Sequence, residues 1–189
     1  MSRLATVLAS LAMALAVSPA ARADEDLWPL MKEGGIVVLM RHAVTTPGIG
    51  DPPGMKVDDC STQRNLTDEG RRHAKVIGDA WRAHGVQPDR VMSSPMCRCL
   101  ETARIAFGRV DESQPATNAR VEPDAARQVR EMRAVATTKH RGSIIVLVSH
   151  GTTIAAVTGI TPAPGELLVV RPQGDGQLEL RGRLLVRAP

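Results

Sequence analysis

Two long runs of apolar residues dominate the pattern of this chain. Residues 36–40 read Ile-Val-Val-Leu-Met, and residues 144–148 read Ile-Ile-Val-Leu-Val. Each run holds five consecutive apolar positions, is rich in β-branched side chains and is bounded by glycine or polar residues. Such runs are typical of strands buried on both faces of a parallel sheet. We therefore expect both runs inside one sheet, with residues 36–40 in its middle.

Along the rest of the chain, stretches with apolar residues at helical spacing alternate with shorter strand-like segments. Thr67, followed by two acidic residues, suits the N-cap of the first long helix. Gly174-Asp175-Gly176 separates two alternating segments, which predicts a closing hairpin. The expected helices cover residues 24–32, 68–85, 95–108, 123–140 and 151–159. The further strands are expected at residues 90–93, 119–122, 166–171 and 177–186.

This alternation of strands and helices predicts an α/β fold. We expect a three-layer sandwich, in which helices flank a mostly parallel central sheet that ends in a C-terminal β-hairpin. Residues 44–59 contain three prolines and three glycines, so they form a long loop at the end of the first strand. That loop is either part of a substrate rim or a passive excursion, and residues 111–117 form a second polar loop.

The first residues are typical of a cleaved secretory signal peptide, residues 1–23. A positive start precedes an apolar run at residues 4–17, and Ala21-Arg22-Ala23 fits a signal-peptidase site. The run is short for a membrane span, so a retained anchor is the lesser alternative. Cleavage after Ala23 would leave residues 24–189 as one domain, periplasmic or secreted, without stable membrane insertion.

Charge and aromatic content argue against a nucleic-acid partner. The formal net charge is +4, but Arg3 and Arg22 belong to the expected signal peptide. The chain has no Tyr, one Phe and two Trp, which leaves few rings on which bases could stack.

Three cysteines indicate one structural bridge and one free thiol. In an oxidising compartment Cys60 would pair with either Cys97 or Cys99. A C-x-C pair alone is poor zinc spacing, and no cysteine is followed by the C-x5-R pattern of cysteine-dependent phosphatases. We expect no metal and no cofactor.

The candidate chemistry lies where the two apolar runs end. Arg41-His42 follows the first run and Ser149-His150 follows the second. Ligands of open α/β sheets bind beyond the carboxyl ends of strands. An Arg-His pair alone is often an ordinary start to a loop, but two strand-end histidines form a constellation. Guanidinium groups bind phosphate in a bidentate manner, and a neutral imidazole can attack phosphorus.

Two further arginines extend this candidate site. Arg98 falls in the first turn of the expected helix after residues 90–93, where helix N-termini favour anions. Arg64 stands in the turn before the first long helix and is either a site residue or a surface residue. The chain lacks the clustered carboxylates that would hold Mg²⁺.

Four motifs in this order resemble the histidine phosphatase superfamily, between about residues 36 and 159. They are Arg41-His42-Ala43, the Ser-Ser-Pro-x-x-Arg-x-x-x-Thr-Ala pattern around Arg98, Ser149-His150-Gly151 and Leu66-Thr67-x-x-Gly70. The resemblance implies a phosphoglycerate mutase-like fold and a phosphorylated nucleophile at His42. It further implies that Arg41 and Arg98 clamp the phosphate, His150 completes the pocket and Arg64 is an extra binding arginine.

The chain also departs from parts of that superfamily. The phytase-type branch has an Asp after the second histidine, where this chain has Gly151. The mutase-type branch takes a Glu from the segment before the second histidine, and Glu122 is our choice for this general acid. Asp124, Glu131 and Glu166 remain open, as does a site without a strong acid. Because the large insertions of mutases are absent, hydrolysis is expected rather than mutase activity.

The expected function is that of a metal-independent phosphomonoester hydrolase acting through a phosphohistidine on His42. Its substrate would be a phosphorylated small molecule, an envelope phosphate ester such as a lipopolysaccharide phosphate, or a phosphohistidine protein. The alternative is a protein that binds phosphate with little or no turnover, and a structural envelope protein ranks third. Nothing in the sequence indicates the oligomeric state.

Overall fold

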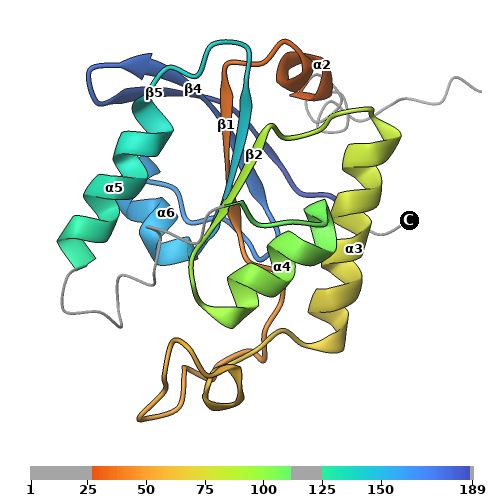
Figure 1. Cartoon of the computed structure of the whole chain (residues 1–189), viewed down its shortest axis with the longest axis vertical. Coiled ribbons are helices and arrows are strands. Elements are labelled where there is room, and N and C mark those ends of the chain that lie inside the picture. Colours follow the sequence, from red (N-terminus) through yellow and green to blue (C-terminus); the bar gives the residue numbers. More distant parts are fainter. Residues whose placement is uncertain (1–26, 112–124, 188–189) are drawn as a thin grey trace, which may run out of the picture.

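The computed structural model describes residues 27–111 and 125–187. These residues form an α/β sandwich around one five-stranded sheet (Figure 1). The strand order across the sheet is β2-β3-β1-β4-β5. The strands are β1 Ile36–Arg41, β2 Arg90–Ser93, β3 Ile144–Ser149, β4 Leu167–Gly174 and β5 Gln177–Leu184. The predicted α/β sandwich with a C-terminal hairpin is therefore confirmed.

Strand β1 occupies the middle of the sheet, as its uninterrupted apolar run predicted. It pairs in parallel with β3, which pairs in parallel with β2. On the other side β1 pairs antiparallel with β4, and β4 pairs antiparallel with β5. The sheet is thus mixed but mostly parallel, because β4 alone runs against the other strands. The five apolar residues of β1 are fully buried, with an exposed fraction of 0%.

Helices cover both faces of the sheet (Figure 1). The helices are α2 Leu27–Lys32, α3 Asp68–Ala83, α4 Cys97–Phe107, α5 Ala125–Thr137 and α6 Gly151–Thr158, with a 3-10 turn at Cys60–Thr62. Helices α2, α3 and α4 lie on one face, and α5 and α6 lie on the other. None of the helices in the described ranges is long and apolar enough to cross a membrane.

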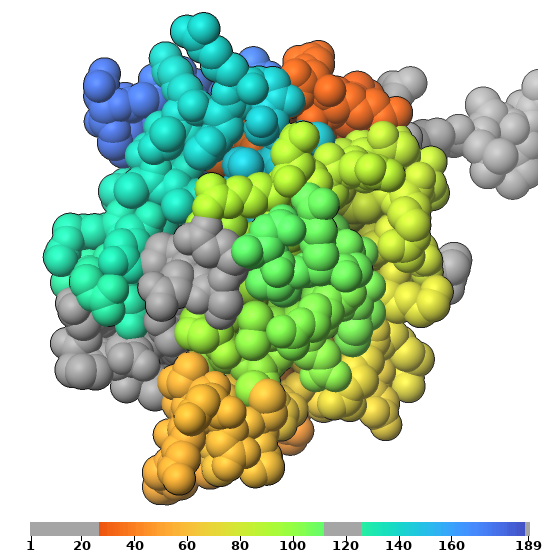
Figure 2. All heavy atoms as spheres, viewed as in Figure 1, coloured from red at the N-terminus to blue at the C-terminus, as the bar shows by residue number. Residues whose placement is uncertain are grey.

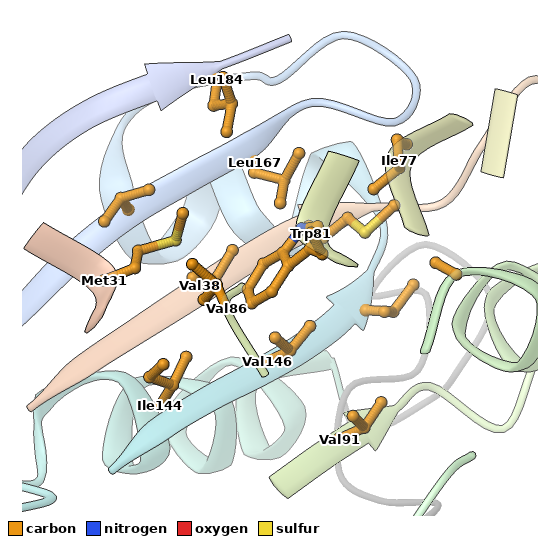
Figure 3. Packing of buried hydrophobic residues seen from close by; sticks show 14 of the residues in the cluster. Met31, Val38, Ile77, Trp81, Val86, Val91, Ile144, Val146, Leu167 and Leu184 are labelled. Atoms are coloured by element: carbon orange, nitrogen blue, oxygen red, sulfur yellow. The ribbon is translucent and has the colours of Figure 1, made fainter. Parts of the chain in front are cut away.

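Successive side chains of β1 point to opposite faces of the sheet, so this strand contributes to a hydrophobic cluster on each face. Val38 points into a cluster that includes Trp81 of α3 and Val146 of β3 (Figure 3). Val37 and Leu39 pack on the opposite face, in a second cluster with residues of α5 and α6. Burial on both faces explains why the strand carries no polar residue before Arg41.

Several boundaries differ by a few residues from the sequence-based predictions, and two of these differences have a clear structural cause. Helix α5 ends at Thr137 rather than near residue 140, because the chain needs the following residues for a turn. The Ser143 amide donates to the His140 carbonyl there, and Gly142 has a positive φ of 70°. Strand β4 runs three residues beyond residue 171, because its pairing with β5 continues to the two-residue turn Asp175-Gly176.

Other predictions fall on segments that the structure does not describe. The signal peptide, the short strand at residues 119–122 and the start of the helix at Pro123 all lie outside the described residues.

Candidate active site

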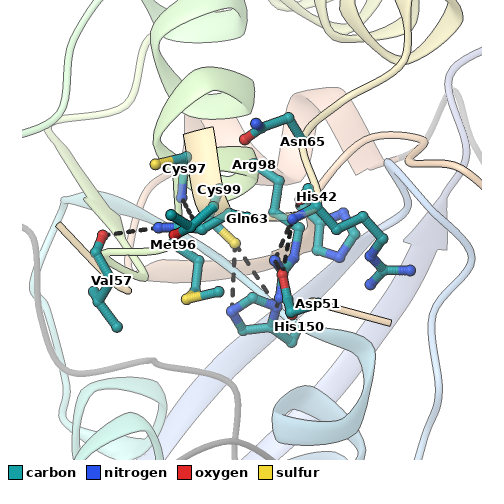
Figure 4. Close-up of polar contacts among 12 residues, drawn as sticks. His42, Asp51, Val57, Gln63, Asn65, Met96, Cys97, Arg98, Cys99 and His150 are labelled. Atoms are coloured by element: carbon teal, nitrogen blue, oxygen red, sulfur yellow. Dashed lines mark hydrogen bonds and ion pairs between the residues drawn. The ribbon is translucent and has the colours of Figure 1, made fainter. Parts of the chain in front are cut away.

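The two strand-end histidines face each other at the carboxyl edge of the sheet. Parallel pairing sets Arg41 opposite Ser149, and the His42 amide then donates to the Ser149 carbonyl at 2.9 Å. The His42 and His150 ring centroids lie 5.5 Å apart, and each residue is 3% exposed. The chain thus brings both imidazoles into one buried site (Figure 4).

Its hydrogen bond selects the tautomer of His42. His42 Nδ1 lies 2.8 Å from the Ala43 carbonyl oxygen, which can only accept. Nδ1 therefore carries the proton, and Nε2 keeps its lone pair. Burial lowers the pKa of His42 to about 3. The hydrogen bond to Ala43 acts in the opposite direction, and the charge of Arg98 lowers the pKa further. At neutral pH this imidazole is uncharged and suited to nucleophilic attack.

Arg98 lies at the first turn of α4 and is completely buried. Its Nη1 donates to Asp51 Oδ1 at 2.8 Å, and its Nη2 lies 3.4 Å from His150 Nδ1. Because a guanidinium only donates, His150 Nδ1 accepts and its Nε2 bears the proton, 2.9 Å from Ser94 Oγ. Burial first, and the charge of Arg98 second, hold the pKa of His150 well below its usual range.

Arg41, Arg64 and Arg98 form an arginine cluster around His42, since the charges of all three lower the pKa of that histidine. Arg41 Nη1 donates to the Pro162 carbonyl at 2.9 Å, and Arg64 Nη1 donates to the Ile49 carbonyl at 2.7 Å. Burial lowers the pKa of both Arg41 and Arg64. The Nε atoms of all three arginines are buried without a hydrogen-bond partner in the described structure. Unsatisfied buried donors of like charge mark a place prepared for an anion.

Gly151 makes room for one member of this cluster. A Cβ at this position would lie 3.3 Å from Arg41 Cδ, a tighter contact than most side chains tolerate. The glycine that departs from the phytase-type pattern therefore lets Arg41 lie against the start of α6.

Thr102 connects the chain next to His42 with Arg98, although sequence reasoning gave it no role. Its Oγ1 accepts from the Ala43 amide at 3.1 Å and donates to the Arg98 carbonyl at 2.7 Å. Thr102 belongs to the motif around Arg98, as does Ser94. The motif was therefore the available signal, but a motif does not show which groups its side chains bond.

The long loop after β1 folds back onto α4. Figure 2 shows it as an orange lobe against the green surface of that helix. Gln63 anchors it, donating to the Lys56 and Val57 carbonyls at 2.9 and 2.8 Å and accepting from the Cys97 amide at 2.9 Å. A Cys60–Cys97 disulfide adds a covalent tie.

The disulfide decides between the two pairings that the sequence left open. Cys99 is the free cysteine; it is buried, and its Sγ lies 3.6 Å from His150 Nε2. Burial raises the pKa of the Cys99 thiol to about 12, which leaves it protonated and unreactive.

The same loop delivers Asp51 into the arginine cluster. Only 8% of the Asp51 side chain is exposed, and Oδ1 accepts from the Arg64 amide at 3.1 Å as well as from Arg98. The loop is therefore part of the site wall. Sequence reasoning did not single out Asp51, because nothing in a Pro- and Gly-rich loop indicates where a carboxylate will point.

Residues 37–122 match the family model of the histidine phosphatase superfamily, branch 1. This match covers less than half of the 189 residues, and it makes that part of the chain similar to the superfamily whose motifs it carries. Among curated proteins it is similar to the mitochondrial serine/threonine-protein phosphatase Pgam5 of Drosophila virilis, with 33% identity over 75 residues. That alignment covers 40% of this chain and 23% of the relative, so the chain spans about a quarter of that protein's length.

Solved structures of similar fold include the protein histidine phosphatase SixA complexed with tungstate. It has a TM-score of 0.56 and 16% identity over 79% of this chain and 96% of that one. The phosphoserine phosphatase of Entamoeba histolytica gives a TM-score of 0.53 and 16% identity, covering 79% and 96% of the two chains. These likenesses confirm the phosphoglycerate mutase-like fold.

The general acid expected of a histidine phosphatase is not identified by these contacts. Glu122 and Asp124 lie outside the described residues. Glu131 pairs with Arg127 on α5 at 2.9 Å. Glu166 is buried, where it accepts from Arg183 at 2.6 Å and from the Ala163 amide at 2.6 Å. The Glu166 carboxylate is thus bound to Arg183 of β5 and to the main chain just before β4.

A metal site was not expected from the sequence. Within residues 27–111 and 125–187, no three His, Cys, Asp or Glu side chains are grouped so that they could hold a metal ion.

Proposed function

We propose that this protein is a metal-independent phosphomonoester hydrolase that works through a phosphohistidine on His42. The observation that carries the proposal is a neutral imidazole whose free Nε2 lies among three arginines with unpartnered Nε donors. A nucleophile without charge, surrounded by fixed cations, suits an attack on phosphorus bearing anionic oxygens.

The reaction takes two steps at phosphorus. The His42 Nε2–P bond forms as the ester P–O bond breaks, and the alcohol leaves with a proton. Water then attacks phosphorus, the N–P bond breaks and inorganic phosphate departs. Negative charge spreads over the equatorial oxygens in both transition states, and the arginine cluster is placed to stabilise it. His150, held between Arg98 and Ser94, orders the buried guanidinium.

The proposed substrate class is a phosphate ester, and the arginine cluster supports it. We infer a phosphorylated small molecule or an envelope phosphate ester, held mainly through its phosphate. The fold is similar to that of a protein histidine phosphatase solved with bound tungstate, which supports the proposal of an oxyanion ligand. The guanidinium groups supply the positive charge that a metal would otherwise bring, which is why we propose metal independence.

The proposed location is the periplasm or the cell exterior. The signal-like segment before Ala23 supports it, and so does the Cys60–Cys97 disulfide, because such bonds persist in oxidising compartments. N-terminal sequencing of protein recovered from a periplasmic extract tests it, with Asp24 as the expected first residue. Recovery from the cytoplasm with Met1 intact would contradict this location.

The activity is tested with p-nitrophenyl phosphate in the presence of EDTA. We expect turnover by the wild type, none by His42→Ala, and transfer of labelled phosphate to His42 in rapidly quenched samples. The matched control is His140→Ala, because His140 bonds the Val135 carbonyl beyond the end of α5 and should leave the rate unchanged. A His42→Ala protein with wild-type rates would overturn the phosphohistidine mechanism. Vanadate binding without any turnover would favour the phosphate-binding alternative.

A further inference from the structure

The arginine cluster already holds an anionic group of the protein itself. Asp51 Oδ1 accepts from Arg98 Nη1 at 2.8 Å and from the Arg64 amide at 3.1 Å. Among the described residues, Asp51 is the only carboxylate in contact with this cluster. A carboxylate there competes with phosphate for the same donors, so binding alone does not explain its presence.

Its position does fit the transfer of a proton. Arg98 joins Asp51 on one nitrogen to His150 on the other, and His42 lies beside them (Figure 4). A phosphate held by Arg98 and attacked by His42 would therefore have its oxygens next to the Asp51 carboxyl. The Asp51 side chain is only 8% exposed. In such surroundings hydrogen bonds and interactions between charges are stronger than in water, which favours proton transfer by a positioned carboxyl group.

We propose that Asp51 is the acid–base catalyst of this site, an inference that rests on the phosphatase activity proposed above. The phosphate oxygens take the place of the carboxylate on Arg98. The reacting form of Asp51 in the complex with substrate is the carboxylic acid, which takes its proton from solvent. It donates that proton to the bridging oxygen as the His42 Nε2–P bond forms and the P–O bond breaks, so a neutral alcohol leaves.

The second step restores the starting state. The Asp51 carboxylate removes a proton from water as the water oxygen bonds to phosphorus and the N–P bond breaks. Inorganic phosphate is released, His42 returns to the neutral tautomer with its proton on Nδ1, and Asp51 is again protonated until the product leaves.

The loop has the anchors that such a role requires. The Arg64 amide is a main-chain donor, so it can keep Asp51 in place after substrate displaces it from Arg98. Gln63 and the Cys60–Cys97 disulfide fix the rest of the loop to α4. Asp51 therefore stays close to the phosphate through both steps.

The test compares Asp51→Asn with the wild type on a series of ring-substituted phenyl phosphates. Asparagine keeps an oxygen acceptor for Arg98 and for the Arg64 amide, but it cannot act as the proton donor. We expect kcat/KM to fall by about 10²–10⁴-fold for unsubstituted phenyl phosphate and by less than about tenfold for p-nitrophenyl phosphate. p-Nitrophenyl phosphate releases a stable anion, so its leaving group needs little help from a proton donor. Asp58→Asn is the matched control, because Asp58 lies exposed on the same loop.

Each other outcome overturns the assignment. An equal loss across the series would make Asp51 a positioning residue, and a gain on all substrates would make it only a blocking group. If Glu122→Gln, but not Asp51→Asn, lost more activity on poor leaving groups than on good ones, Glu122 would be the proton donor. Turnover of p-nitrophenyl phosphate by Asp51→Asn shows that the variant folds. A wild type inactive on the whole series refutes the proposed function itself, which separates that failure from the others.

Discussion

At the scale of single residues, the protonation of His42 is set by what surrounds the ring. Burial and the charge of Arg98 lower the pKa of His42, whereas the hydrogen bond to Ala43 raises it, and the balance is about 3. A histidine exposed on a loop would keep a value near 6.5 and would be partly charged in mild acid. The fold therefore keeps His42 neutral over a wide range of pH.

This pKa predicts a loss of stability in acid. Below about pH 6.5 the unfolded chain protonates His42 and the folded protein does not, so the free energy of unfolding falls as the pH drops towards 3. At about pH 5 the contribution of His42 to this fall is about 2 kcal/mol. Urea unfolding of wild type and His42→Gln at about pH 7 and 5 measures it, and the variant should lose less stability. Equal losses in both proteins would contradict the prediction.

At the scale of elements, the start of α3 is built against the chain that follows His42. Thr67 caps the helix by accepting from the Gly70 amide at 3.0 Å, and the Thr67 amide donates to the Val44 carbonyl at 3.1 Å. A Cβ on Gly70 would collide with the carbonyl oxygen of Val44. The Leu-Thr-x-x-Gly motif thus has a packing reason, since only glycine allows this close approach.

Gly70→Ala should therefore weaken both the fold and the site. In an unconstrained helix this change stabilises by about 1 kcal/mol, but here the added methyl must push Val44 away, at a cost of about 1–3 kcal/mol. Because Val44 is two residues from His42, turnover of p-nitrophenyl phosphate should also fall. Denaturant unfolding and kcat measure the two effects, with the exposed neighbour Glu69→Ala as control. A more stable Gly70→Ala protein would show that the contact is absent.

At the scale of the whole molecule, the site joins segments far apart in the chain into one cluster of arginine and histidine side chains. Arg41 ends β1, Arg64 precedes α3, Arg98 lies in the first turn of α4, and His150 follows β3. An anion that bridges these segments must stabilise the folded state, because the unfolded chain does not hold them together.

Vanadate or phosphate should accordingly raise the melting temperature of the wild type. At one hundred times its dissociation constant, a ligand specific for the folded state adds about 2.7 kcal/mol to the free energy of unfolding. Arg98→Met should lose most of this ligand-induced shift, while Arg130→Met, on the exposed side of α5, should keep it. Differential scanning fluorimetry with and without the anion compares them. A full shift in Arg98→Met would remove Arg98 from the binding site.

Local information was enough to predict the elements and part of the site. The apolar run before Arg41 specifies a doubly buried strand, and the similar run before Ser149 specifies a second one. Because both are parallel strands, their ends had to meet at one edge of the sheet, so the approach of His42 to His150 followed from the sequence. Arg98 was placed beside them for a related reason, since its helix follows the next parallel strand.

Tertiary structure alone decided the contacts that depend on distant segments. Cys97 and Cys99 are two positions apart on one helix and face different sides, so only the path of the loop shows that Cys60 meets Cys97. Asp51 reaches Arg98 across 47 positions of sequence, from a loop without periodicity. Residue patterns report which side of an element is buried. They do not report where an irregular loop returns, because that depends on long-range packing and on which buried donors still lack a partner.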